Sequence, residues 1–174
     1  MNQEAIRDKL ISRFGQESIL ATVLFRDQIT ATVVKEKIRE VCLFLRHDPD
    51  LDFSFLSFVA GVDRYPDKPR FEVVYQLYSL KHNHRFRVKT LLEQPEKGIP
   101  AVDSVTDIWP TANWHERETA EMYGMVFSGH PDPRKLLLPD HWDCHPLRKD
   151  FPIEGTDADT PELPKRGKTE VLSS

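Results

Sequence analysis

The sequence contains little cysteine: Cys42 and Cys144 are the only two among its 174 residues. An iron–sulfur cluster usually takes four thiolate ligands, and a disulfide framework needs several cysteines at recurrent spacings. We therefore expect neither a disulfide scaffold nor a redox cluster on this chain.

Glycine is scarce as well, and the seven glycines are never arranged as G-x-G-x-x-G or G-x-x-x-x-G-K. Those patterns let a main-chain loop approach a phosphate closely, so their absence argues against a nucleotide site. The nucleophile elbow G-x-S-x-G is also missing. The sequence thus offers none of the common enzyme motifs, and no cofactor is expected on this chain.

Apolar runs are short, and none approaches the roughly 18 to 20 residues that a membrane-spanning helix requires. Residues 1–9 resemble neither a secretory signal nor an organelle transit peptide. We expect a cytoplasmic protein that contacts a membrane only through partners. The net charge of -4 provides no basic field for counterion release, so nucleic acid is not an expected partner.

Periodic patterning in the first part of the chain predicts an α+β domain over residues 1–106. Apolar residues at a four-residue step before Gly15 indicate one helix, and a second helical stripe ends before Asp48 and Pro49. The expected order is helix 6–14, strands 18–25 and 27–34, helix 34–45, and strands 53–62, 71–78 and 85–90. Strands in runs favour a mixed sheet with helices packed on one face.

Two expectations in this domain concern burial. The stretch 53–62 is nearly all apolar, which predicts a strand buried on both faces. His82 and His84 fall within the expected turn 81–84 and are predicted to be solvated.

The rest of the chain differs, because nine of the 13 prolines lie between residues 100 and 164. Proline lacks an N–H donor and restricts φ, so an extended arm is expected in place of long sheet pairing. One helix interrupts this arm, with Asn113 and Glu116 at capping-box spacing and Gly124 at its end. We expect this helix and a docking arm over residues 107–155, followed by a tail over 156–174 that is mobile or ordered by a partner.

Charged residues gather on the predicted helix, and they allow three interpretations. Two carboxylates could share a proton and act as acid and base. The charges could instead lie on a solvated face with a weak pair between Arg117 and Glu121, or meet other charges inside an interface. The cluster consists of Glu116, Arg117, Glu118 and Glu121.

Possible metal ligands form no complete set. The helix begins like the H-E-x-x-H zinc pattern, but Thr119 stands where the second histidine is needed. His141, Cys144 and His145 lie within five residues, yet no fourth ligand has the spacing of a zinc finger. A small metal-dependent or acid–base hydrolase, built on this loop and the charged helix, is the alternative from another class.

The run from Asn113 to Pro152 mixes large aromatics, arginines and prolines without periodicity. Trp, Tyr and Arg are enriched in interface cores, because they supply contact area and directional hydrogen bonds. We therefore expect this run to lie against other polypeptides.

The same run resembles the signature of a known family. Its residues are Glu116-Arg117-Glu118, Glu121-Met122-Tyr123-Gly124, Phe127, His130-Pro131-Asp132, Arg134-Lys135-Leu136-Leu137-Leu138 and Pro146-Leu147-Arg148-Lys149-Asp150-Phe151-Pro152. This series is similar to that of the C-type subunits of NADH–quinone oxidoreductase, the thirty-kilodalton subunit family of complex I. The likeness covers residues 50–155, and the first 50 residues match only in outline. The chain departs from the family pattern at Ala120, Pro133 and Cys144, which concerns local packing.

The resemblance implies a non-catalytic structural subunit in the peripheral arm of a complex on the cytoplasmic side of the bacterial cell membrane. Such a complex passes electrons from NADH through flavin and iron–sulfur centres to quinone, coupled to proton translocation, with these cofactors on other subunits. The neighbours implied are the large quinone-site subunit and the cluster-bearing subunits. The residues implied to contact them are Glu116, Arg117, Glu118, Tyr123, His130, Arg134, Leu147, Arg148, Lys149, Asp150 and Phe151.

Two further alternatives stay open. Similar segments occur in membrane-bound hydrogenase complexes and ferredoxin-dependent relatives, where this chain would hold an equivalent place. A generic adaptor without a redox partner is the other.

Overall fold

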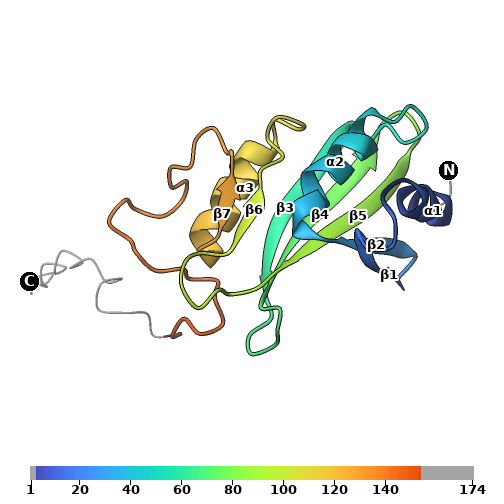
Figure 1. Ribbon diagram of the computed structural model, residues 1–174. Coiled ribbons are helices and arrows are strands. Elements are labelled where there is room, and N and C mark those ends of the chain that lie inside the picture. The colour runs from blue at the N-terminus through green and yellow to red at the C-terminus, as the bar shows by residue number, and fades with distance from the viewer. Residues whose placement is uncertain (1–2, 154–174) are drawn as a thin grey trace, which may run out of the picture.

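The computed structural model of the chain describes residues 3–153, in which three α-helices pack on one face of a five-stranded sheet (Figure 1). In chain order the elements are α1 (Gln3–Phe14), β1 (Ile19–Phe25), β2 (Gln28–Val33), the 3-10 turn η1 (Lys35–Lys37), α2 (Ile38–His47), β3 (Phe55–Asp63), β4 (Phe71–Ser79), β5 (His84–Leu92), β6 (Ala101–Asp103), α3 (Ala112–Tyr123) and β7 (Val126–Ser128). The predicted α+β class is confirmed. None of these helices is long and apolar enough to cross a lipid bilayer.

The large sheet has the strand order β1-β2-β5-β4-β3. Its strands are antiparallel except at the junction of β2 with β5, which run parallel. The predicted hairpin is formed by β1 and β2, and its two turn residues, Arg26 and Asp27, have φ of 49° and 59°. Two successive positive φ angles suit a two-residue turn whose twist matches that of the strands.

The core lies between the sheet and the helices. The side chains of Val73, Tyr75 and Leu77 alternate along β4 on the helix side and are fully buried. On α2, Ile38 and Leu45 belong to an equally buried stripe spaced at three and four residues, as the sequence predicts.

Two burial expectations were wrong. β3 is an edge strand, and Phe55 and Phe58, which pair with residues on the sheet face opposite the helices, are 45% and 37% exposed. An apolar run does not reveal whether a second layer covers that face. His84 is 8% exposed: β5 begins at this residue, and its Nε2 lies 2.9 Å from the carbonyl oxygen of Leu51. Its ring packs against Phe53.

α3 lies beside β3 on the helix side of the sheet (Figure 1). Gly61 of β3 permits this approach, since a Cβ there would lie 2.5 Å from Cδ2 of Tyr123. Gly124 ends α3 with φ of 65°, as predicted. The capping-box prediction was wrong: the N-cap is Thr111, which makes no side-chain cap hydrogen bond, and Glu116 faces the interior.

Candidate functional site

The candidate site is the contact between α3 and the arm, defined as residues 129–153. The arm is coloured orange in Figure 1, where it loops away from α3 and returns toward its C-terminal end. No helix or strand forms within these residues. Charged side chains of α3 bind the main chain of the arm. Residues that the sequence predicts to contact other polypeptides therefore make contacts within their own chain.

Glu116 is fully buried and binds the loop that precedes α3. Its Oε2 accepts a hydrogen bond from Ser104 Oγ at 2.6 Å, and its Oε1 accepts one from the N–H of Val105 at 2.8 Å. Burial raises the pKa of Glu116 to about 7, and the two hydrogen bonds only partly oppose this effect. The carboxyl therefore joins the 104–105 loop to α3, and burial makes its ionised form energetically unfavourable.

His130, at the start of the arm, packs beside this carboxyl. Its Nδ1 accepts a hydrogen bond from the N–H of Asp132 at 3.0 Å, which leaves Nε2 as the protonated ring nitrogen. Nε2 then donates to the carbonyl oxygen of Asn113 at 3.1 Å, while Oε2 of Glu116 lies 4.0 Å away. The ring thereby connects the arm to the first turn of α3.

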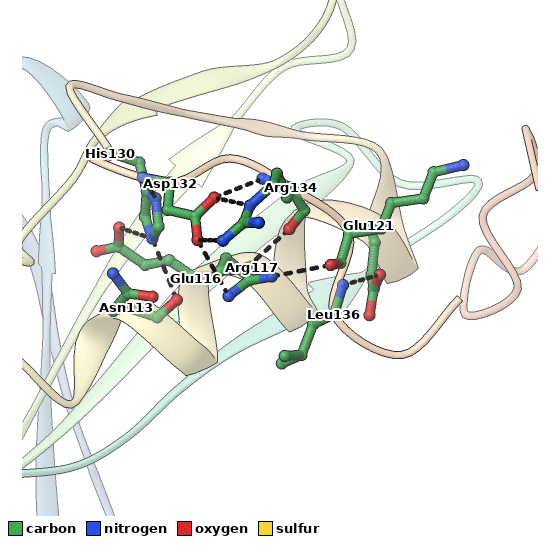
Figure 2. Close-up of polar contacts among 9 residues, drawn as sticks. Asn113, Glu116, Arg117, Glu121, His130, Asp132, Arg134 and Leu136 are labelled. Carbon is green, nitrogen blue, oxygen red and sulfur yellow. Dashed lines mark hydrogen bonds and ion pairs between the residues drawn. The ribbon is translucent and has the colours of Figure 1, made fainter. Parts of the chain in front are cut away.

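Arg117 holds the next part of the arm through main-chain carbonyl oxygens (Figure 2). Its Nε donates to the carbonyl of Arg134 at 2.8 Å and its Nη2 to that of Lys135 at 2.9 Å. Asp132 completes the cluster, 3.5 Å from Arg117 and bonded twice by the Arg134 side chain, at 2.7 and 2.8 Å. These hydrogen bonds from Arg134 hold the pKa of Asp132 well below its usual range.

Glu121, one turn after Arg117, binds main-chain N–H groups of the same segment, whereas Arg117 binds its carbonyl oxygens. Its carboxylate accepts hydrogen bonds from the N–H groups of Leu136 and Leu137, both at 2.8 Å (Figure 2 shows the first). The residue is 7% exposed, so the solvated-face interpretation is wrong for it. α3 therefore clamps both the carbonyls and the N–H groups of the arm.

Arg148 binds the C-terminal end of α3. Its Nε donates to the carbonyl oxygen of Tyr123 at 2.6 Å and its Nη2 to that of Gly124 at 3.0 Å. These carbonyls have no partner within the helix, and a cation is favoured at the negative end of the helix dipole. A Cβ at Gly124 would overlap the ring of His145 and lie 2.6 Å from Arg148, so this position requires glycine for space as well as for φ.

The end of the arm is attached to the sheet by a second ionic cluster. Asp63, at the end of β3, accepts hydrogen bonds from the Arg70 guanidinium at 2.9 and 2.8 Å and from the N–H of Lys149 at 2.9 Å. Arg70 also bonds Asp150 at 2.7 Å. Burial acts to raise the pKa of Asp63, but these hydrogen bonds lower it to about 2. Asp63 and Arg70 were not among the predicted site residues, because no local spacing connects them to the arm.

The eleven residues implied by the resemblance therefore have different surroundings. Those with side chains engaged inside the chain are Glu116, Arg117, His130, Arg134, Arg148 and Asp150. Those with exposed side chains are Glu118, Arg134, Leu147 and Lys149, while Tyr123 and Phe151 are half-buried. Large apolar side chains also face outward around the arm: Trp114, Leu137, Leu147 and Ile153 are 59%, 61%, 52% and 101% exposed.

The residues of the hydrolase alternative do not converge. Glu116 is fully buried whereas Glu118 is exposed, and Nδ1 of His145 lies 2.7 Å from the carbonyl oxygen of Glu121. Among residues 3–153, no three side chains of His, Cys, Asp or Glu are grouped so as to hold a metal ion.

Two departures from the family pattern meet at one place. Ala120 and Pro133 line a cavity of about 130 Å³ between α3, β7 and the arm. Met125 and Phe127 form its apolar wall. The small side chain of Ala120 thus leaves space beside the buried Glu116.

Comparison with protein families matches residues 31–157 to the model of "Respiratory-chain NADH dehydrogenase, 30 Kd subunit". A C-type subunit of NADH-quinone oxidoreductase from Rhizobium meliloti (strain 1021) is 51% identical over 123 residues, which are 71% of this chain and 65% of the relative. The corresponding C-type subunit from Geotalea uraniireducens (strain Rf4) is 40% identical over 149 residues, covering 86% and 87% of the two chains. The match to the first relative thus leaves about a third of that protein without a counterpart.

Two solved structures share the fold. A trypsin-resistant fragment of Nqo5 is 30% identical with a TM-score of 0.61, over 76% of this chain and 99% of the fragment. A chain of the membrane-bound sulfane sulfur reductase, an archaeal respiratory membrane complex, is 25% identical with a TM-score of 0.65, over 86% and 85% of the two chains.

Proposed function

Because the chain belongs to the family of the 30 kDa subunit of respiratory-chain NADH dehydrogenase, we propose that it is a non-catalytic structural subunit of a membrane-bound NADH–quinone oxidoreductase. Flavin, iron–sulfur clusters and quinone then reside on partner subunits, and electrons pass from NADH to quinone there, coupled to proton translocation. The chain lies in the peripheral arm on the cytoplasmic side of the cell membrane. Its partners are the large quinone-site subunit and the neighbouring cluster-bearing subunits.

The observation that carries this proposal is the clamp between α3 and the arm. Arg117 and Glu121 bind main-chain groups of the arm, and Arg148 of the arm binds main-chain carbonyls at the end of α3. Binding of this kind rigidifies an extended segment that has no regular secondary structure. A rigid segment loses less conformational entropy when a partner binds it, so the clamp favours docking over chemistry.

The docking surface is formed by side chains that the clamp leaves outside. Trp114 stacks beneath the Arg117 guanidinium, whose carbon lies 5.4 Å from the ring centroid, and still exposes 59% of its surface. Leu147 is held by its neighbour Arg148 and by a hydrogen bond from its own N–H to the carbonyl of Met122, yet is 52% exposed. Aromatic and arginine groups of this kind commonly supply most of an interface's binding energy.

Leu147→Glu tests this proposal, with Leu80→Glu as its control. Leu80 is 67% exposed in the turn between β4 and β5, away from the arm. Recovery of each variant with flavin- and cluster-bearing subunits is measured after gentle solubilisation of membranes. Leu147→Glu is expected to lower recovery about tenfold, since it places a charge in an apolar contact. Equal recovery of wild type and Leu147→Glu, or equal loss in both variants, would overturn the proposal.

The likeness to the sulfane sulfur reductase chain supports a second candidate, an equivalent subunit of a membrane-bound hydrogenase or ferredoxin-dependent complex. The same clamp would serve either assembly. The two are separated by the proteins that co-purify, because only an NADH-dependent complex requires a flavin-bearing NADH subunit.

A further inference from the structure

The sheet has a second face, opposite the helices, on which cations form a row. Arg85, Arg87 and Lys89 alternate along β5, the central strand, with Phe86 and Val88 pointing to the core between them. Residues two apart on a strand share a face, so the three cations project from the same side. A chain with a net charge of -4 thus concentrates positive charge at the middle of this face.

Arg87 is held in place by two amides from neighbouring strands. Its Nε donates to Oε1 of Gln76 on β4 at 3.0 Å, and its Nη2 donates to Oε1 of Gln28 on β2 at 2.9 Å. Gln28 also donates to Oε1 of Gln76 at 2.8 Å, which closes the network. The guanidinium is therefore preorganised across three strands, and Nη1 takes no part in these bonds.

The charge of Arg87 is left without a carboxylate partner within residues 3–153, where both of its bonds go to neutral amides. The nearby carboxylate of Glu72 is already shared, at 2.9 Å with Lys89 and at 3.2 Å with Arg64. A half-buried cation normally has a counter-ion, since desolvation of an unpaired charge is costly. The face therefore has excess positive charge and a fixed donor available for an anion.

Apolar side chains flank this site on both sides. Phe25 pairs with Gln28 across the hairpin and is 67% exposed, and Phe58 pairs with Gln76 and is 37% exposed. An oriented arginine between exposed aromatic rings matches the composition of interface hot spots. A free inorganic anion would leave both rings in water, whereas a polypeptide carrying a carboxylate between apolar side chains would cover them.

We propose that this face, centred on Arg87, is a second docking surface that binds an acidic segment of a partner protein in the complex, with an Asp or Glu carboxylate on the free edge of the guanidinium. The surface is separate from the arm and extends the proposed function, on which it rests, to a second contact. Bidentate arginine–carboxylate bonding supplies the specificity, and the two phenylalanines supply apolar area.

The test is site-specific photo-crosslinking in membranes that contain the assembled complex. A photoreactive residue replaces Thr30, which pairs with Arg87 on the adjacent strand. We expect crosslinks that map by mass spectrometry to a partner segment next to an Asp or Glu. Arg87→Gln should lower their yield about tenfold, because it removes the charge-assisted contact with the carboxylate. Lys81→Gln, which removes an exposed cation in the turn before β5, should leave the yield unchanged.

Controls separate this outcome from misfolding and from failure of the arm contact. Thermal melting of the purified variants reports folding, and Arg87→Lys, which keeps the charge, should retain more crosslinking than Arg87→Gln. A photoreactive residue at Leu147 reports the arm contact independently. Crosslinks to residues 154–162 of the same chain, to a second copy or to a segment without a carboxylate would overturn the proposal. An undiminished yield in Arg87→Gln would do the same.

Discussion

Arg148 donates from Nε to the carbonyl oxygen of Tyr123 at 2.6 Å, joining the end of α3 to a residue twenty-five positions later in the chain. The bond gives a hydrogen-bond donor to a main-chain carbonyl at the end of α3, where the helix has no N–H group of its own left to bind it. It also sets the direction of the arm, because Leu147 and Lys149 on either side are thereby turned outward. The residues of the family signature thus shape the arm through contacts within their own chain.

Replacement of Arg148 should affect assembly more than folding. Arg148→Ala removes two hydrogen bonds to carbonyls at the end of α3, an expected loss of about 1 to 3 kcal/mol of arm attachment. We expect reduced incorporation into the complex and near-normal far-UV circular dichroism of the isolated chain. Arg148→Lys can make only part of this contact and should fall between the two. Normal incorporation of Arg148→Ala in a pull-down would contradict the clamp's role.

Glu121 should protect the arm from proteolysis. Glu121→Ala leaves the N–H groups of Leu136 and Leu137 without their acceptor, so the neighbouring main chain should open more often. Trypsin is then expected to cut after Arg134 and Lys135 several times faster, as followed by mass spectrometry.

The control for this experiment is Glu118→Ala, which removes an exposed carboxylate from the same helix and should leave the cleavage rate unchanged. Glu121→Gln keeps an acceptor without the charge and should give an intermediate rate. If all three variants were cleaved at the wild-type rate, Glu121 would not hold the arm.

Local patterns predicted the local elements well. The helix that ends at Gly15, the hairpin turn at Arg26 and Asp27, and the stop of α3 at Gly124 all depend on residues a few positions apart. Each follows from periodicity or from a φ requirement that a single residue meets. Such features can be read without knowing what lies next to them in space.

Contacts between distant segments could not be predicted in this way. Asp63 is 86 residues from Lys149, whose N–H it binds, and Arg70 is 80 residues from Asp150. Glu116 is a second contact that local spacing did not predict. Its distance in sequence from Asn113 suits a capping box, but in the fold its carboxyl accepts hydrogen bonds from Ser104 and Val105 instead. A tertiary partner replaced the local one, and no sequence signal distinguishes the two.

Glu116 should make the stability of the chain depend on pH between about 4.5 and 7. The pKa is raised from 4.5 to about 7 in the fold, so the folded state binds this proton more tightly than the unfolded state. Its contribution is fully favourable below pH 4.5 and is lost as pH rises through 7, a difference of about 3 kcal/mol. Burial is the main cause, and the charge of Asp107 adds to it.

Glu116→Gln isolates this contribution, because the amide is neutral and can still accept from Val105 and donate to Ser104. Relative to wild type, its melting temperature should rise progressively from pH 5 to pH 8. Glu118→Gln, on the exposed side of the helix, should show no such trend. A difference between Glu116→Gln and wild type that is the same at pH 5 and at pH 8 would refute the assignment.

A side chain at position 61 should lower the stability of the fold mainly because the ring of Tyr123 lies against this position. A Cβ at position 61 would lie 2.5 Å from Cδ2 of Tyr123 and 3.0 Å from Cγ2 of Thr119, so α3 would have to move away from β3. We expect Gly61→Ala to lower stability by about 1 to 3 kcal/mol, the usual range for overpacking. In a Tyr123→Ala background the ring is gone, and the same change should cost much less. Urea unfolding of the four chains of this double-mutant cycle measures the coupling between the two residues. Equal costs in both backgrounds would mean that α3 does not rest on β3 through this contact, and the arm would then lack a fixed support.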